Sequence, residues 1–285
     1  MIIVKLMGGL GNQMFQYALG RRLSLIRNVP LKADCGFLQT ETDEHVKREY
    51  GLGIFNLNIS IANKKELDKF SRKIHGILPF LWPYYVVNES KHSYDDNVLN
   101  AHKNSYLNGF WQTEKYFKPI EEIIRKDFAF KPITDSLNKA TAEKIRSVNA
   151  VSVHVRRGDY VSNKNTNEYH GTCGIDYYSQ AADIIKQKAG DPHFFIFSDD
   201  IDWVKQNLNF GSAVTYVENN KGANNYIDMQ LMSLCKHNII ANSSFSWWGA
   251  WLNSSEQKVV VAPGKWFNQA ALDTSDVIPQ GWIKI

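Results

Sequence analysis

The second half of the chain alternates between short apolar runs and amphipathic stretches. Five apolar runs predict buried strands, at 150–155, 194–197, 214–217, 238–241 and 258–262. Between them, apolar residues recur at helical spacing in 177–188, from 202, in 226–235 and through Trp251. Strands that alternate with helices predict a parallel, doubly wound α/β sheet.

The chain opens with another unit of this kind. Residues 2–6 are apolar and end at a glycine-rich turn, and Asn12 stands where a helix N-cap is expected. The region 38–130 is irregular and rich in aromatic residues, with one helical stretch near 64–74, and its elements cannot be ordered from the pattern. We place a domain boundary near residue 145, which predicts domains 1–145 and 146–285.

Composition removes several classes of function. The chain has 285 residues, 44% of them hydrophobic and only 8 of them proline, which is typical of a globular protein. Its net charge of +4 is not gathered into a basic stripe, so we expect no nucleic-acid partner. Its 3 cysteines are scattered without a C-x-x-C pair, which argues against a disulfide framework or zinc site. This favours a reducing, cytoplasmic location.

The terminus and the longest apolar stretch bear on membranes. Residues 1–5 run into a strand pattern without a basic leader, so no signal peptide is predicted. The stretch 77–87 holds two prolines and is too short to span ~30 Å of hydrocarbon. Its Trp82, Tyr84 and Tyr85 follow the basic run 64–73, so contact with a membrane surface and simple burial are both open. We expect at most peripheral contact at the inner face of a membrane.

Two arginines follow the strand at 150–155. On extended backbone Ser152, His154 and Arg156 share one face, so His154 and Arg156 should point into one crevice and Arg157 away from it. A guanidinium fork suits phosphate oxygens and stays charged. Asp159 is a natural partner for one of the arginines. A surface loop with an ion pair is the alternative interpretation.

An aspartate pair ends the strand at 194–197. Asp199 and Asp200 could hold a divalent metal against a diphosphate, but adjacent side chains diverge on extended backbone. A helix is predicted to begin near Asp202, which makes an N-cap the favoured role of one of them.

The segment 239–248 changes from an apolar strand to a polar turn and then to a helix. Such a helix start, with hydroxyls at Ser243 and Ser244, is suited to phosphate, although an ordinary serine cap has the same pattern. Trp247, Trp248 and Trp251 are more typical of core packing than of a sugar platform.

The glycine-rich turn at 8–13 is incomplete as a nucleotide motif. Met14 replaces the third glycine of the dinucleotide fingerprint, and no Gly-Lys-Ser/Thr follows that would make a P-loop. A tight loop facing a cleft remains.

These motifs together resemble glycosyltransferase family 11, the bacterial and animal α-1,2-fucosyltransferases, and more distantly the α-1,6- and protein O-fucosyltransferases. The matching segments occur in the family's order, at 8–17, 154–160, 197–200 and 228–252. The resemblance implies two Rossmann-like α/β domains facing a cleft, a GT-B-like fold. It places the acceptor at domain 1–145 and GDP-fucose on domain 146–285.

The resemblance also implies roles for single residues. Arg156 neutralises the β-phosphate, and Asn12, in the cleft-facing loop with Gly9, Gly11 and Gln13, faces the reacting centre. The remaining donor-binding residues are His154 beside the nucleoside, Asp228 on guanine, and Ser243, Ser244 and Phe245 around the diphosphate. The family needs no metal, so no cofactor is expected.

An inverting displacement wants a base beside the acceptor hydroxyl. The family's glutamate does not carry over at the same spacing, which leaves Asp159, Glu168, His170 and Asp176. We favour Asp159, which gives a predicted catalytic set of Arg156, Asp159 and Asn12. Asp159 orienting Arg157 is the alternative.

The predicted activity is transfer of L-fucose from GDP-β-L-fucose to the 2-OH of a terminal galactose in a glycan acceptor. A fucosyltransferase with another acceptor linkage fits the same pattern. An oxidoreductase would need an intact glycine fingerprint, and a glycan-binding module would leave the arginine pair without a role.

Overall fold

The computed structural model describes residues 1–40, 47–71, 83–158, 161, 164–269 and 272–285. The chain forms two compact units. The first consists of Met1–Ala129 and Ser275–Val277, and the second of Phe130–Thr274 and Ile278–Ile285. The division thus falls earlier in the chain than the boundary placed near residue 145.

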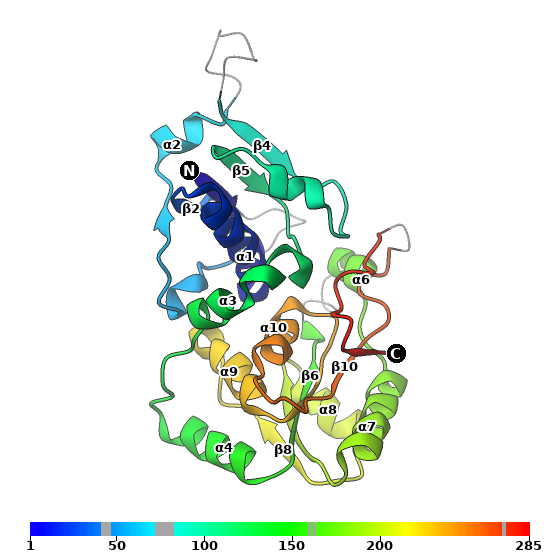
Figure 1. Ribbon diagram of the computed structural model, residues 1–285. Coiled ribbons are helices and arrows are strands. Elements are labelled where there is room, and N and C mark those ends of the chain that lie inside the picture. Colours follow the sequence, from blue (N-terminus) through cyan, green and yellow to red (C-terminus); the bar gives the residue numbers. More distant parts are fainter. Residues whose placement is uncertain (41–46, 72–82, 159–160, 162–163, 270–271) are drawn as a thin grey trace. The chain divides into compact units, whose positions relative to one another are not determined.

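The first unit contains a five-stranded parallel sheet in the order β3-β2-β1-β5-β4. Figure 1 labels its strands β2, β4 and β5. Its strands are β1 (Ile2–Lys5), β2 (Leu31–Asp34), β3 (Ser60–Ile61), β4 (Tyr85–Asn88) and β5 (Ser105–Asn108). Its α-helices are α1 (Leu10–Arg27), α2 (Lys64–Asp68) and α3 (Glu121–Asp127). Short 3₁₀ turns account for part of the irregular pattern, at Gly36–Gln39, Leu52–Ile54, Asp96–Asn100, Glu114–Tyr116 and Lys118–Ile120.

Helix α1 packs directly on the first sheet. A Cβ atom on Gly20 would lie 2.5 Å from a Val4 side-chain carbon and 2.7 Å from one of Leu31, so a larger residue would force these side chains to shift. The helix ends at Asn28, whose left-handed φ of 51° is a common C-cap conformation for asparagine. The opening strand, glycine turn and helix are therefore present as predicted. The predicted N-cap is wrong, since the helix already begins at Leu10 after Gly9 and Asn12 lies within its first turn.

The second unit contains a six-stranded parallel sheet in the order β11-β10-β9-β6-β7-β8. Its strands are β6 (Ala150–Val155), β7 (His193–Ser198), β8 (Val214–Val217), β9 (His237–Ile239), β10 (Val260–Ala262) and β11 (Ile283–Lys284). Its helices are α4 (Ser136–Ser147), α6 (Lys164–His170), α7 (Ile175–Ala189), α8 (Ile201–Asn207), a 3₁₀ turn (Gly222–Asn224), α9 (Tyr226–Leu234) and α10 (Ser244–Leu252). The predicted parallel α/β sheet is confirmed.

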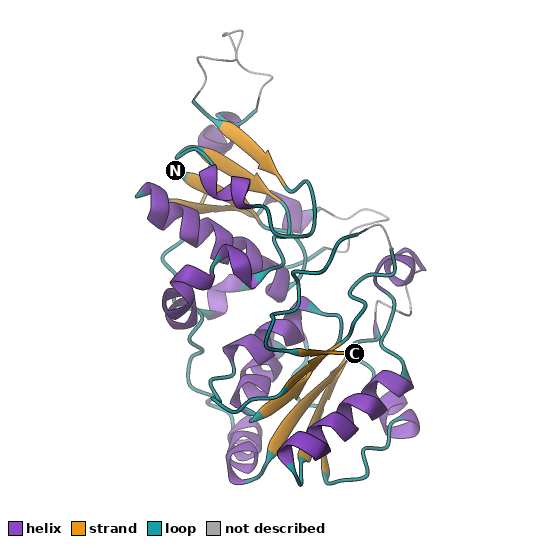
Figure 2. Ribbon diagram, turned by 45° about the vertical axis from the view of Figure 1, so that its right-hand side comes forward, coloured by secondary structure: helices purple, strands orange, loops and turns teal. Residues whose placement is uncertain are grey.

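Helices cover both faces of this second sheet (Figure 2). On one face Val153 packs with Tyr178 and Ile185 of α7. On the other, Phe195 packs with residues of α4 and α9, among them Ile145 and Leu231. Burial on both faces explains the continuous apolar runs of the strands. It also explains the earlier division of the chain, because α4 contributes to this core.

Two structural features bear on membrane contact, namely the character of the helices and the exposure of the apolar stretch 77–87. Among the described residues, no helix is both long and apolar enough to cross a bilayer. Trp82 lies outside the described residues. Tyr84 contacts Phe70 at a ring distance of 5.2 Å, whereas Tyr85 on the edge strand β4 is 49% exposed. In the described part of the stretch 77–87, Tyr84 is therefore packed against a neighbouring ring and Tyr85 is exposed.

Candidate functional site

Polar side chains gather where the strands of the second sheet end. Since all of its described strand pairs are parallel, the segments that follow β6, β7, β8 and β9 emerge at one edge. These segments carry Arg156, Asp199, Asp228 and Ser243 respectively. Ligands of open α/β sheets bind at this edge.

The two arginines after β6 diverge. Nη1 of Arg156 lies 2.6 Å from Oδ2 of Asp199, and the Arg156 side chain keeps 27% of its surface exposed. Arg157 instead pairs with Asp200 at 3.1 Å and lies over the Trp203 ring, with Cζ 3.8 Å from the ring centre. The predicted divergence is confirmed. Asp159, predicted as an arginine partner and as the base, lies outside the described residues.

The aspartate pair serves the arginines and a helix. Asp200 caps α8, since its Oδ1 accepts from the Trp203 backbone N–H at 3.3 Å. Oδ1 of Asp199 accepts from the Arg157 N–H at 2.8 Å. The cap interpretation is confirmed. In the described part of the chain, no group of three or more His, Cys, Asp or Glu side chains could hold a metal ion.

His154 lies buried beside the start of α10. The residue is only 7% exposed, and its ring centre lies 5.8 Å from the ring centre of Phe245. Burial lowers the pKa of His154 to about 4, against the opposing effect of Asp199 and with a further lowering by Arg156. The imidazole is therefore neutral near pH 7. Its buried Nδ1 has no hydrogen-bond partner among the described residues, so a ligand group could pair with it.

Helix α10 begins at a braced polar turn. Ser243 is the N-cap, and its Oγ accepts from the Phe245 N–H at 3.3 Å. The Asn242 amide donates to the His170 carbonyl at 2.9 Å and to the carbonyls of Gly171 and Trp266 at 3.3 Å. The serine cap is thus present, and it leaves the helix N-terminus directed toward the strand ends, where anions are favoured.

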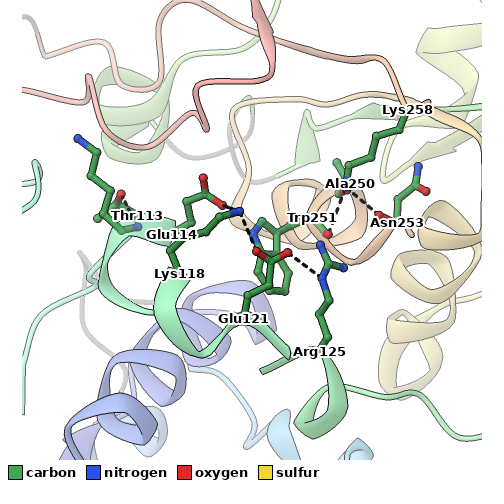
Figure 3. A network of polar contacts seen from close by, with 10 residues as sticks. Thr113, Glu114, Lys118, Glu121, Arg125, Ala250, Trp251, Asn253 and Lys258 are labelled. Carbon is green, nitrogen blue, oxygen red and sulfur yellow. Dashed lines mark hydrogen bonds and ion pairs between the residues drawn. The ribbon is translucent and has the colours of Figure 1, made fainter. Parts of the chain in front are cut away.

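The rest of α10 is fixed by its core face and its last turn. Trp247, Trp248 and Trp251 are at most 3% exposed, so they pack in the core and form no sugar platform. The Lys258 ammonium donates to the carbonyls of Ala250 at 2.8 Å, Trp251 at 3.3 Å and Asn253 at 2.8 Å (Figure 3). A cation at a helix C-terminus stabilises the helix dipole and satisfies its last carbonyls.

Asp228 lies in the first turn of α9, anchored by the buried residues Ile227 and Leu231. Burial raises the pKa of this carboxyl to about 7, while a hydrogen bond from Asn220 to its Oδ1, at 2.8 Å, acts in the opposite direction. Among the described residues no hydrogen bond reaches its second oxygen. Asp228 lies at the same sheet edge as His154 and Arg156, and no hydrogen bond or ion pair joins it to either of these two described residues.

A small cavity adjoins the turn before α10. It has a volume of about 190 Å³, and its lining includes Cys173, Tyr177, Asn242 and Lys265. The Tyr177 hydroxyl donates to the Ile240 carbonyl at 2.6 Å. The cavity therefore reaches Asn242, just before the predicted diphosphate loop, but none of the predicted donor-binding residues lines it.

The predicted glycine loop belongs to the first unit, where its amides are engaged. Asn12 accepts from the Gln112 side chain at 2.8 Å. Gln13 donates to the carbonyls of Gly8 and Glu49 and accepts from the Gly51 N–H, at 2.9–3.0 Å. Gly9 precedes α1 and Gly11 lies in its first turn. Gln13 thus braces the loop, a role that the sequence pattern did not reveal.

The remaining base candidates lie on two helices of the second unit. Glu168 is exposed on α6, and Asp176 is exposed in the first turn of α7. The His170 ring packs against Phe267, with ring centres 5.4 Å apart. None of these positions identifies the base, which stays a prediction.

Sequence reasoning missed two buried asparagines. Asn138 on α4 is 2% exposed and Asn220 after β8 is 9% exposed. The two side chains bond to each other, and Asn220 also donates to Asp228. Asn220 lies eight residues before Asp228 in the chain, so a polar pair just ahead of the α9 pattern was the available signal.

The chain is similar to known glycosyltransferases along its whole length. The model of the family described as glycosyl transferase family 11 matches residues 1–285. An α-1,2-colitosyltransferase of Escherichia coli is 38% identical over 295 residues, covering 100% of this chain and 98% of the relative. Galactoside α-(1,2)-fucosyltransferase 1 of Mus musculus is 26% identical over 255 residues, covering 86% and 61%.

A solved structure shows the shared fold. An Arabidopsis thaliana FUT1 mutant in complex with GDP superposes with a TM-score of 0.51 and 10% identity, covering 91% of this chain and 69% of that one. The likeness agrees with the two parallel α/β units and with the predicted fold class. With a family match along its whole length, the chain belongs to glycosyltransferase family 11 and is a glycosyltransferase related to α-1,2-fucosyl- and α-1,2-colitosyltransferases.

Proposed function

We propose that the protein transfers L-fucose from GDP-β-L-fucose, with inversion, to the 2-OH of a terminal galactose in a glycan acceptor. The observation that carries the donor half of this proposal is the sheet edge of the second unit. There Arg156 keeps part of its guanidinium exposed beside the buried His154, and α10 begins close to that imidazole. The family relationship supports the reaction class.

The diphosphate is the part of the donor that this edge suits best. When the glycosyl bond breaks, negative charge grows on the departing phosphate oxygen. Arg156 and the N-terminus of α10, with Ser243, Ser244 and Phe245, are fixed in advance to receive that charge. To bind phosphate, Arg156 must share or exchange its contact with Asp199. We propose that His154, whose buried Nδ1 has no hydrogen-bond partner among the described residues, contacts the nucleoside.

Asp228 is suited to read the base. A carboxylate accepts two hydrogen bonds from the N1–H and 2-amino group of guanine, and adenine lacks this paired donor edge. One oxygen of Asp228 is held by Asn220, and a lone pair on each oxygen remains for a ligand. This supports GDP as the nucleotide.

The chemical step is a single displacement. The acceptor oxygen attacks C1 of the sugar while the C1–O bond to phosphate breaks, and GDP leaves with the electron pair through an oxocarbenium-like transition state. The acceptor proton passes to a base, for which we propose Asp159, with Asn12 facing the reacting centre. A deoxy sugar lacks one electron-withdrawing hydroxyl, so departure is eased and a weak base suffices. No metal enters this scheme.

A second donor is favoured by one comparison. The 38% identical relative is a colitosyltransferase, and colitose is fucose without its 3-hydroxyl. The residues discussed above are proposed to contact the phosphate and the base, which the two GDP-sugars share, so we expect them to accept either donor. Discrimination between the two sugars would require a group that pairs with the 3-hydroxyl.

Product analysis tests the proposal. The purified protein is incubated with GDP-fucose or GDP-colitose and a panel of galactosides, and product linkages are determined by NMR. We expect an α-1,2-linked fucosyl galactoside. Transfer to another hydroxyl would contradict the proposed linkage, and preferential use of GDP-colitose would contradict the proposed donor.

We further propose that the protein acts in the cytoplasm, with peripheral membrane contact at most. Cell fractionation with and without a salt wash of the membranes would test this location.

A further inference from the structure

Three asparagines fill the space between α4 and the segment that joins β8 to α9. Asn138 and Asn220 bond in both directions, with Nδ2–Oδ1 distances of 2.7 Å and 2.9 Å. Asn219 donates to Oδ1 of Asn138 at 3.0 Å and to Oδ1 of Asn220 at 3.2 Å. Asn138 and Asn220 are both buried, so these amide contacts replace water.

The amide of Asn220 has a fixed orientation. One of its N–H groups donates to Oδ1 of Asp228 at 2.8 Å and the other to Oδ1 of Asn138. Its own oxygen accepts from Asn138 and Asn219. Rotating the amide by 180° would set its oxygen against the oxygens of Asp228 and Asn138, and its N–H groups against those of Asn138 and Asn219. Its donor side must therefore face Asp228.

Asn138 is anchored at the other end of the cluster. Its backbone N–H donates to Oδ1 of Asp135 at 2.9 Å, and its side-chain Nδ2 donates to Oδ2 of the same residue at 3.1 Å. Asp135 is the N-cap of α4. A continuous series of hydrogen bonds therefore runs from the start of α4 through two buried amides to the carboxyl group in the first turn of α9.

We propose that Asn138 and Asn220 are positioning residues, which hold the Asp228 carboxylate ionised and correctly oriented to accept the two N–H donors of a guanine base. This inference rests on the proposed use of a GDP-sugar. Neither asparagine needs to touch the nucleotide, because each acts through Asp228.

The electrostatic surroundings make the Asn220 contact decisive. Helix α10, packed against α9, carries no ionisable side chain. The ionisable groups of the other packed elements are His154 on β6 and, on α4 with its cap, Asp135, Lys139, Glu143, Lys144 and Arg146. Burial raises the pKa of Asp228 to about 7, and the bond from Asn220 is the interaction that lowers it.

GDP affinity should depend on pH through the ionisation of Asp228. Guanine recognition needs the ionised carboxylate, so GDP affinity should rise as the pH increases through about 7. Removing the Asn220 donor raises the pKa further, because the ionised form loses its stabilising hydrogen bond. The midpoint of the affinity profile should then move to higher pH. A purely structural role would lower stability and leave the midpoint unchanged.

Calorimetric titration of GDP between about pH 6 and pH 8.5 tests this. Asn220→Ala should bind GDP roughly tenfold more weakly near pH 7 and show a higher midpoint. Asn138→Ala should shift the midpoint in the same direction by less. The matched control is Asn219→Ala, which removes a donor from the same cluster without touching Asp228 and should keep the wild-type midpoint. Asp228→Asn should abolish the pH dependence.

A ligand-free measurement separates this inference from the proposed function. Carbon-13 NMR of the Asp228 carboxyl in the unliganded protein should give a higher pKa in Asn220→Ala than in the wild type. An unchanged pKa, or an unchanged affinity profile in a folded Asn220→Ala variant, overturns the inference while GDP binding stands. Absence of GDP binding by the wild type overturns the proposed function. If Asn220→Ala does not fold, Asn220→Ser takes its place in both measurements.

Discussion

Two turns of similar construction serve different ends in this protein. In the first unit, β1 leads through a glycine turn into α1, and in the second, β9 leads through a serine turn into α10. Each turn lies at the carboxyl end of a parallel strand. Helix α1 begins at Gly9 without a side-chain cap, whereas α10 begins at Ser243, which caps it.

The turns differ in what their polar groups contact. In the first unit the buried amides of Gln13 and Gln16 bond the backbone: Gln16 accepts from Met7 at 3.0 Å and donates to Gly109 at 3.2 Å. Around the second turn, by contrast, His154 has a buried nitrogen without a hydrogen-bond partner among the described residues. Asp228 has bonding capacity to spare.

This contrast separates polar groups that hold the chain from polar groups that await a ligand. A buried polar atom costs free energy unless it is paired. Where the protein supplies the partner, as at Gln13 and Gln16, the residue is structural. Where it does not, as at His154, a ligand is the expected partner. Substitutions in the two regions should therefore affect different measurements.

The largest effect is expected at Arg156. Arg156→Ala should lower kcat/KM by roughly 10²–10³-fold, because one preorganised donor to a developing oxyanion is lost. Arg156→Lys should restore little, since an ammonium cannot form the planar fork. Steady-state kinetics with the preferred donor measure both. The matched control is Arg157→Ala, which removes the neighbouring arginine that stacks on Trp203 and should keep most of the activity. An Arg156→Ala variant with more than about a tenth of the wild-type rate would contradict the assignment.

A smaller loss is expected at Asp228, and it should be selective. Asp228→Ala should weaken GDP binding by roughly tenfold to a hundredfold and narrow the gap to ADP and UDP, because the paired acceptor for guanine is lost. Titration calorimetry with the three nucleotides decides this. If Asp228 only supported its helix terminus, the variant would be less stable by ~0.3–1 kcal/mol and equally selective.

Gln16 should show the opposite behaviour. Gln16→Ala leaves a buried N–H and a buried carbonyl without their partner, which should lower the free energy of unfolding by roughly 1–3 kcal/mol per unpaired group. GDP affinity of the folded fraction should not change. Urea denaturation followed by GDP titration tests both statements. Gln230→Ala, which removes a solvent-exposed amide contact to the Lys131 carbonyl, is the control and should cost within about 0.5 kcal/mol. Weakened GDP binding by folded Gln16→Ala would contradict the purely structural role assigned to Gln16.

No effect is expected from chelation. Asp199 and Asp200 are engaged by Arg156 and Arg157, so we propose that the diphosphate is neutralised by side chains and a helix terminus. Activity in excess EDTA should equal that of the untreated enzyme. Loss of activity that Mg²⁺ or Mn²⁺ restores would show that the second region uses a cation as well.

Much of the second unit could be predicted from sequence, and much less of the first. Strands such as 194–197 are buried on both faces and therefore read as continuous apolar runs, which local patterns reveal. The first sheet places β5 between β1 and β4, an order set by long-range pairing. Its two-residue strand β3 and its 3₁₀ turns carry too little periodicity to be recognised.

At the site, local pattern and tertiary structure contributed different things. The alternation along β6 correctly separated Arg156 from Arg157, because side chains on extended backbone point to opposite faces. The partners of these arginines were not predictable, since Asp199 and Asp200 follow a different strand. Helix α4 likewise lies mostly before the boundary predicted near residue 145, and only its packing on α9 shows that it completes the core of the second unit.

Three features could be inferred from the amino-acid sequence alone: the family, the alternation of strands and helices in the second half, and the residue types suited to a nucleoside diphosphate. These features depend on the spacing of residues and on short motifs, so they can be recognised without knowledge of tertiary contacts. The connection from the start of α4 to Asp228 through Asn138 and Asn220 became visible only in the folded chain, because these two asparagines lie 82 positions apart. Burial and hydrogen bonding depend on what folds against a residue, so a polar group's role is settled by its neighbours in space.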